Sequence, residues 1–145
     1  MLTDEYFMEM AIKEAMKALD NDEVPIGAVL VSNQKIIARG YNQVEQLHDV
    51  TAHAEILCIT SASAHYHNKY FPDCTLYVTM EPCMMCATAI GWAQIGKLVY
   101  GAADERKGFT HFSPSVLHPK AEVVSGVMAD ECSTLVKDFF RSKRN

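Results

Sequence analysis

Two short stretches decide the fold of this chain, Thr51-Ala52-His53-Ala54-Glu55 and Glu81-Pro82-Cys83-Met84-Met85-Cys86. Together they offer one imidazole and two thiolates, a donor set that zinc binds in proteins. Three protein ligands leave the fourth tetrahedral position of zinc open to water, which distinguishes a catalytic zinc site from a structural one. The sequence therefore predicts a zinc site made by His53, Cys83 and Cys86.

A Cys-x-x-Cys pair alone is also typical of structural zinc knuckles and of redox-active cysteines. Here a His-x-Glu motif precedes the pair by a helix-sized gap, and Pro82 stands directly before Cys83. We therefore interpret the site as catalytic, with zinc lowering the pKa of bound water to give a hydroxide nucleophile.

Glu55 lies two residues after His53, close enough to act beside the metal without binding it. We expect it to take a proton from the attacking water and to pass it on. The competing interpretation is a solvated carboxylate in a first helical turn, where the helix dipole favours negative charge.

Length and composition are those of one ordinary globular domain. The chain has 145 residues, 49% hydrophobic and 21% charged, and we expect a single domain over residues 1–145. There is no apolar run of membrane-spanning length and no signal-peptide pattern, so we expect a cytoplasmic protein without a membrane partner. Five cysteines, an odd number, argue against a disulfide framework. The net charge of -5 disfavours indiscriminate nucleic-acid binding but allows a local basic patch.

The spacing of apolar residues predicts an α/β fold with a mixed sheet covered by helices. We expect a polar loop over residues 42–50 and a long connection over residues 102–120. The expected helices cover residues 3–19, 52–64 and 83–93, and the expected strands cover residues 24–31, 35–41, 75–79, 97–101 and 123–124. Asp130 is expected to cap a last helix, with Leu135, Val136, Phe139 and Phe140 on its inner face.

Several residues allow two interpretations. Gly27 interrupts an apolar strand, which indicates either a β-bulge, the interpretation we favour, or close backbone approach to a ligand. His65 and His67 have no third partner, so we expect surface residues rather than a second metal site. Trp92 is expected to be a core or subunit-contact residue.

Beyond the metal motifs, the sequence resembles the bacterial tRNA-specific adenosine deaminases. The zinc motifs alone identify only the cytidine-deaminase-like superfamily, whereas the C-terminal match is more specific. The matching stretches cover nearly the whole chain and comprise residues 23–29, 40–42, 49–55, 75–83, 99–102 and 129–141.

The resemblance implies a three-layer α/β/α cytidine-deaminase-like fold with a five-stranded mixed sheet, a homodimer, and conversion of adenosine to inosine in a tRNA anticodon stem-loop. It also implies a role for each matching residue. His53, Cys83 and Cys86 match the zinc ligands, Glu55 the proton donor, and Asn42, Ala54 and Asp104 positions that line the substrate pocket.

Two further features bear on the substrate. The long connection after residue 101 can hold a crossover, so the last two strands can be parallel, as in the polynucleotide-acting branch that the chain resembles. Lys137, Arg141, Lys143 and Arg144 place basic charge at one end of an acidic chain, suited either to phosphates or to the dipole of a final helical turn.

The chain departs from the family pattern at Val50, Ala103 and residues 109–114, which bears on anticodon-loop recognition rather than on zinc chemistry. Two alternatives therefore stay open. One is deamination of a free base or nucleoside such as guanine, cytosine or adenine. The other is a non-catalytic, zinc-stabilised interaction domain, against which Glu55 argues.

Overall fold

The structure is a computed structural model that describes residues 1–144. Its helices and strands alternate after an opening helix and hairpin, as the apolar spacing predicts. In chain order they are α1 (Asp4–Asp20), β1 (Gly27–Ser32), β2 (Lys35–Tyr41), α2 (Val44–Leu47), α3 (Ala54–Tyr66), β3 (Cys74–Met80), α4 (Met84–Trp92), β4 (Lys97–Ala102), β5 (Glu122–Val124) and α5 (Ala129–Lys143).

Within the described residues, the strands form one five-stranded mixed sheet in the order β2-β1-β3-β4-β5. β1 pairs antiparallel with β2 and with β3, while β3–β4 and β4–β5 are parallel. The long connection between β4 and β5, which holds 3₁₀ turns at Phe109–His111 and Pro114–Val116, makes the second parallel pairing possible. The predicted parallel arrangement of the last two strands is confirmed.

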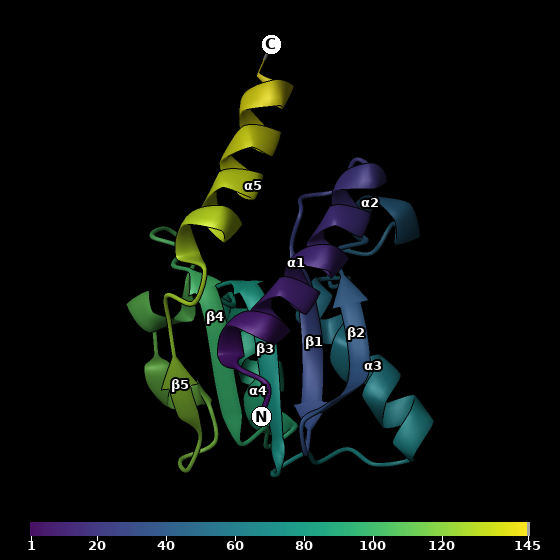
Figure 1. The fold of residues 1–145 in the computed structure, drawn as a ribbon, viewed down its shortest axis with the longest axis vertical. Coiled ribbons are helices and arrows are strands. Elements are labelled where there is room, and N and C mark those ends of the chain that lie inside the picture. The colour runs from purple at the N-terminus through teal and green to yellow at the C-terminus, as the bar shows by residue number, and fades with distance from the viewer. Residues whose placement is uncertain (145) are drawn as a thin grey trace.

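Helices cover both faces of the sheet, so the predicted three-layer α/β/α arrangement is confirmed (Figure 1). Alternate residues of a strand point to opposite faces. Leu30 of β1 therefore belongs to the core cluster that includes Cys58 of α3 and Ile90 of α4, whereas Val29 belongs to the cluster that includes Phe7 of α1 and Cys132 of α5. The upper part of α5 extends beyond the strand ends (Figure 1).

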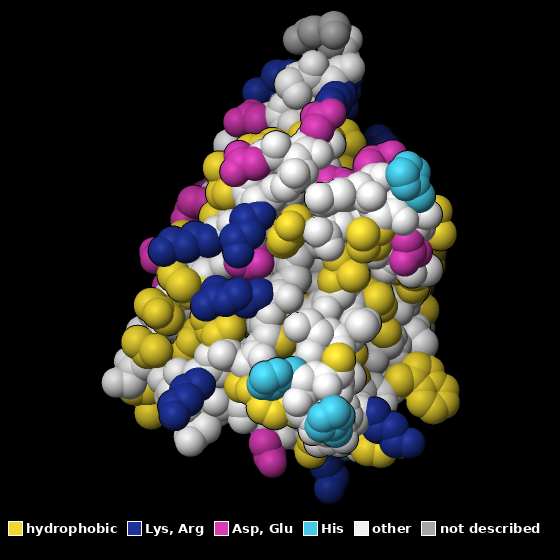
Figure 2. Space-filling view, turned by 90° about the vertical axis from the view of Figure 1, so that its right-hand side faces the viewer, with side chains coloured by type: hydrophobic (Ala, Val, Ile, Leu, Met, Phe, Trp, Pro, Cys, Tyr) yellow, Lys and Arg dark blue, Asp and Glu magenta, His cyan; other side chains and the backbone are white. Residues whose placement is uncertain are grey.

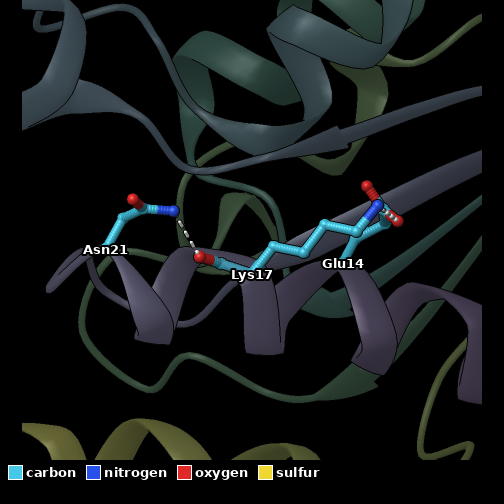
Figure 3. A network of polar contacts seen from close by, with 3 residues as sticks. All are labelled: Glu14, Lys17 and Asn21. Atoms are coloured by element: carbon cyan, nitrogen blue, oxygen red, sulfur yellow. Dashed lines mark hydrogen bonds and ion pairs between the residues drawn. The ribbon is translucent and has the colours of Figure 1, made fainter.

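Helix α1 begins and ends at capping side chains. The Thr3 hydroxyl accepts a hydrogen bond from the Tyr6 N–H, as an N-cap does. Near the other end, the Nζ atom of Lys17 lies 2.7 Å from Oε2 of buried Glu14, and the Asn21 side chain donates to the Lys17 carbonyl (Figure 3).

Gly27 serves neither of the two purposes considered for it. The register shift in the β1–β2 hairpin lies at Leu30/Val31, so Gly27 is not the bulge. A Cβ atom on Gly27 would collide with the backbone of Ala11 and Ala15, so the close approach is to helix α1 and not to a ligand. The missing side chain lets α1 lie directly on the start of β1.

Three other local expectations are wrong. Residues 42–50 contain the short helix α2 rather than an unbroken loop. Asp130 lies inside the first turn of α5, and the N-cap position belongs to Met128, which has a left-handed backbone. Phe140, expected on the inner face of the last helix with Leu135, Val136 and Phe139, is 43% exposed.

On the β2 and α3 side, Lys and Arg side chains occur in separate groups with Asp and Glu side chains between them (Figure 2). Within residues 1–144, none of the helices is long and apolar enough to cross a membrane.

Candidate active site

The three predicted zinc ligands come from the starts of two helices. His53 is the N-cap of α3 and Cys83 is the N-cap of α4, both with extended backbone, and Cys86 lies in the first turn of α4. The His53 carbonyl accepts the Leu57 N–H, so the ligand itself begins its helix. Because two helices begin beside each other, residues thirty positions apart in sequence become neighbours.

The donor atoms have the spacing that zinc requires. Nδ1 of His53 lies 3.7 Å from Sγ of Cys83 and 3.5 Å from Sγ of Cys86, and all three atoms lie within 4.8 Å of one another. Zn–S distances of about 2.3 Å and Zn–N distances of about 2.0 Å place the donors of a tetrahedral site about 3.5–3.8 Å apart. The residues present therefore fit a zinc ion, and the predicted donor set is brought together.

The two thiols share one proton in the metal-free chain. The hydrogen bond from Cys86 lowers the pKa of Cys83 to about 4, and the same bond raises the pKa of Cys86 above its usual range. The contact with Cys83 also raises the pKa of His53. The site thus already holds a thiolate, the form that binds metal.

Glu55 lies in the first turn of α3 and is buried, with 4% of its surface exposed. Burial raises the pKa of its carboxyl to about 7, because the charged form loses its hydration. The interpretation of Glu55 as a solvated carboxylate is therefore wrong. A buried carboxyl with a pKa near neutrality has the property of a proton shuttle.

A cavity of about 660 Å³ opens onto these residues. Its walls include His53, Glu55 and Cys83, and also each residue expected in a substrate pocket, namely Asn42, Ala54 and Asp104. Cys86 is fully buried behind this surface.

Asn42 and Asp104 also hold their own walls in place. The Asn42 side chain donates to the Val24 carbonyl and accepts the Val44 N–H, each at 3.2 Å. Oδ1 of Asp104 accepts the N–H groups of Arg106 and Lys107, each at 3.0 Å. These bonds fix the direction of both side chains.

The outer wall of the cavity was not predicted. It includes Val136, Phe139, Phe140 and Lys143 of α5, and Lys107 from the loop after β4. The sequence does suggest a basic C-terminal helix, but only the fold shows that α5 reaches the cavity. Lys143 forms an ion pair with Asp22, another wall residue, and Nζ of Lys143 lies 5.4 Å from the centre of the Phe139 ring.

Two buried glutamates in the cavity wall also escaped prediction. Glu23 accepts the N–H groups of Glu45 and Gln46 at the start of α2. Glu81 accepts hydrogen bonds from Asp104 and Thr110. Both glutamates had a signal in the sequence, because Glu81 stands directly before the Pro-Cys motif and Glu23 opens the family-like stretch of residues 23–29.

Other residues lie away from the cavity. His65 and His67 are exposed at the end of α3, as expected. Trp92 is 78% exposed, so it is not a core residue. Cys58, Cys74 and Cys132 are buried free cysteines.

Comparisons with known proteins place this geometry in a family. The model of the cytidine and deoxycytidylate deaminase zinc-binding region matches residues 1–102. A tRNA-specific adenosine deaminase of Agrobacterium fabrum is 45% identical over 144 residues, which covers 96% of this chain and 95% of that protein.

Solved structures agree with this placement. One from a study of A-to-I editing by tRNA:A34 deaminases at the wobble position superposes with a TM-score of 0.83 and 43% identity, covering 90% of this chain and 98% of that one. Guanine deaminase from Bacillus subtilis has a TM-score of 0.67 and 36% identity, covering 70% of this chain and 66% of its own. The cytidine-deaminase-like fold is thus confirmed. The chain belongs to the cytidine and deoxycytidylate deaminase zinc-binding family and, within it, to the tRNA-specific adenosine deaminases.

Proposed function

We propose that this protein deaminates adenosine to inosine at the wobble position of tRNA, with an anticodon stem-loop as substrate. One observation carries the proposal: the zinc ligands His53 and Cys83 and buried Glu55 line one cavity, whose outer wall presents the cation of Lys107 and the Lys143–Asp22 ion pair. An extruded base can reach the buried residues while its flanking phosphates stay near the cations. The names and near-complete coverage of the relatives support the same substrate.

Zinc held by His53, Cys83 and Cys86 would supply Lewis-acid activation of water for attack on C6 of adenine. Glu55 takes a proton from that water and gives it to ring nitrogen N1 as the C6–O bond forms. Glu55 then takes the proton of the new C6 hydroxyl and delivers it to the exocyclic nitrogen, so that the C6–N6 bond breaks, ammonia leaves and C6 keeps a carbonyl oxygen. Burial raises the pKa of Glu55 to about 7 in the metal-free chain, and a carboxyl whose charged form is disfavoured in this way can both accept and donate a proton.

Asn42, Ala54 and Asp104 form the walls against which the base is held. The Asn42 amide uses one donor and one acceptor position within the protein, and an amide has two of each. One N–H and one lone pair therefore remain for a purine. The hydrogen bonds of Asp104 occupy Oδ1 and leave Oδ2 for substrate, while Ala54 adds a small apolar surface beside the metal.

The protein is further proposed to be a cytoplasmic homodimer of single-domain chains. Trp92, at the end of α4, stands exposed beside a groove of about 430 Å³ that Tyr70 and Leu117 also line. A large exposed aromatic next to an apolar groove is typical of a subunit contact. Sedimentation at micromolar concentration tests this directly, and a monomer would contradict it.

A second candidate function is deamination of free guanine, favoured by the 36% identity to the Bacillus subtilis guanine deaminase. The zinc-loaded protein should be assayed on an arginine-tRNA anticodon stem-loop with a wobble adenosine, and on free adenosine, adenine, guanine and cytosine. Inosine from the stem-loop alone supports the first function. Activity on guanine alone supports the second, and no activity on any substrate would favour the non-catalytic interaction domain.

A further inference from the structure

We propose that Glu81 is a positioning residue: it ties the loop that carries Asp104 and Lys107 to the zinc-binding segment and thereby sets the cavity wall that holds the substrate. The substrate named in the test below rests on the proposed function. Glu81 lies directly after β3 and two residues before the ligand Cys83. It is buried, with 4% of its surface exposed, and it contributes to the cavity lining.

One carboxylate holds both ends of this loop. Oε1 of Glu81 accepts the N–H of Asp104 at 3.1 Å. Oε2 accepts the N–H of Thr110 at 3.1 Å and its hydroxyl at 2.7 Å. Hydrogen bonds to an ionised acceptor are about twice as strong as neutral ones, and burial excludes competing water.

The middle of the loop is pinned against the same segment. Gly108 packs on the Glu81 carboxylate so closely that a Cβ atom would collide with it. The N–H of Phe109 donates to the Pro82 carbonyl at 2.9 Å, and Gly108 forms an isolated antiparallel bridge with Cys83. Glu81 therefore occupies the centre of a contact between the loop and a metal ligand.

Asp104 and Lys107 lie between, or at, these anchor points, and both line the cavity. Loosening the loop moves these wall residues but leaves His53, Cys83 and Cys86 on their helix starts. Glu81 should consequently affect how tightly the substrate is held, and not the bond-breaking step or the metal. This separates a positioning role from a general structural one, which would change stability, zinc content and turnover together.

The test compares Glu81→Gln with Glu105→Gln, an exposed residue of the same loop that loses the same charge. Glutamine keeps the size of Glu81 but replaces one carboxylate oxygen by an NH₂ group. That group cannot accept a hydrogen bond from the N–H of Asp104 or Thr110, so one end of the loop loses its hydrogen bond to residue 81. We expect Glu81→Gln to raise KM for the wobble-adenosine stem-loop about tenfold, with kcat within twofold and the zinc content unchanged. Glu105→Gln should keep the wild-type KM. A loss of kcat at unchanged KM, loss of zinc, or a wild-type KM would overturn the proposal.

Thr110 provides a second variant pair in case Glu81→Gln does not fold. Thr110→Val removes the hydroxyl bond to Glu81, whereas Thr110→Ser keeps it. Thr110→Val should raise KM severalfold, whereas Thr110→Ser should keep the wild-type KM. Equal KM values for the two variants would overturn the proposal.

A readout without substrate separates this inference from the proposed function. Hydrogen exchange of at least one of the Asp104 and Thr110 amides should be faster in zinc-loaded Glu81→Gln than in Glu105→Gln. This result is expected even if the stem-loop proves not to be the substrate. Unchanged exchange at both amides would overturn the positioning role.

Discussion

Nδ1 of His53 lies 3.5 Å from Sγ of Cys86, although 33 positions separate the two residues in the chain. The contact exists because α3 and α4 begin side by side, on the same face of the sheet, with His53 and Cys83 as their N-caps. The metal donors are thus fixed by where two helices start. The reactivity of the site then depends on the residues that surround these helix starts.

Glu55→Gln should abolish turnover while leaving the metal site intact. The amide cannot accept a proton from water, and general acid–base catalysis by one side chain contributes about 10²–10⁴-fold. We therefore expect kcat to fall by at least about 10²-fold, with zinc content and the circular dichroism spectrum unchanged. Full activity in the variant would show that another group moves the proton.

The same substitution should stabilise the metal-free protein at alkaline pH. The folded-state pKa of Glu55 is about 7, above the ordinary value of 4.5. The protonated carboxyl is therefore favoured by folding, and this contribution to stability is lost as the pH rises through 7. Glutamine does not ionise, so the advantage of the variant should widen between pH 5 and pH 8, to at most ~3 kcal/mol. Urea unfolding of both chelator-treated proteins at the two pH values measures it, and a constant difference would contradict the burial argument.

Zinc affinity should rise with pH. In the metal-free chain Cys83 has a pKa of about 4 and is a thiolate at neutral pH, while the raised pKa of Cys86 keeps that thiol protonated. Zinc must displace this proton, and also any proton on His53, whose pKa is raised. Competition with a chelator between pH 6 and pH 8 should show affinity increasing about tenfold per unit for each proton displaced. An affinity that is flat over this range would mean that both thiols are already ionised.

Lys107→Met should weaken stem-loop binding in a salt-dependent way. Lys107 lines the cavity and takes part in none of the ion pairs found among residues 1–144, so its charge is available to a phosphate. Removing one phosphate contact lowers the slope of log K against log salt concentration by about one unit. The control is Lys13→Met, an exposed residue of α1 that does not line the cavity. Equal slopes for the two variants would exclude a phosphate contact at Lys107.

The sequence predicts the metal donors well because their spacing reports local geometry. His53 and Cys83 precede apolar helices, and Cys86 lies one turn after Cys83. The motif residues are therefore also the residues at which the two helices begin, and both can be recognised from the same local sequence. The strands and the parallel pairing of β4 with β5 likewise follow from apolar spacing and from the length of one connection.

The features that the sequence did not predict correctly share a different cause, which is contact between segments far apart in the chain. Helix α2 forms where polar residues suggest a loop. It is stabilised by Glu23, which lies more than twenty positions earlier in the chain and accepts the N–H groups of Glu45 and Gln46. Gly27 is explained by the backbone of α1. Phe140 is exposed because it borders a cavity rather than the core. None of these partners is visible within a local window of sequence.

The position of α5 has a consequence for how this protein can change over evolution. All metal donors and Glu55 precede residue 102, where the matched family region ends, whereas Asp104, Lys107 and the α5 wall follow it. The reacting centre thus lies entirely before residue 102, whereas both parts of the chain contribute to the cavity wall, since Asn42 and Ala54 precede that residue. Recombination near Ala102 could exchange one substrate preference for another without disturbing the reacting centre, and chimaeras joined at this point would keep their zinc.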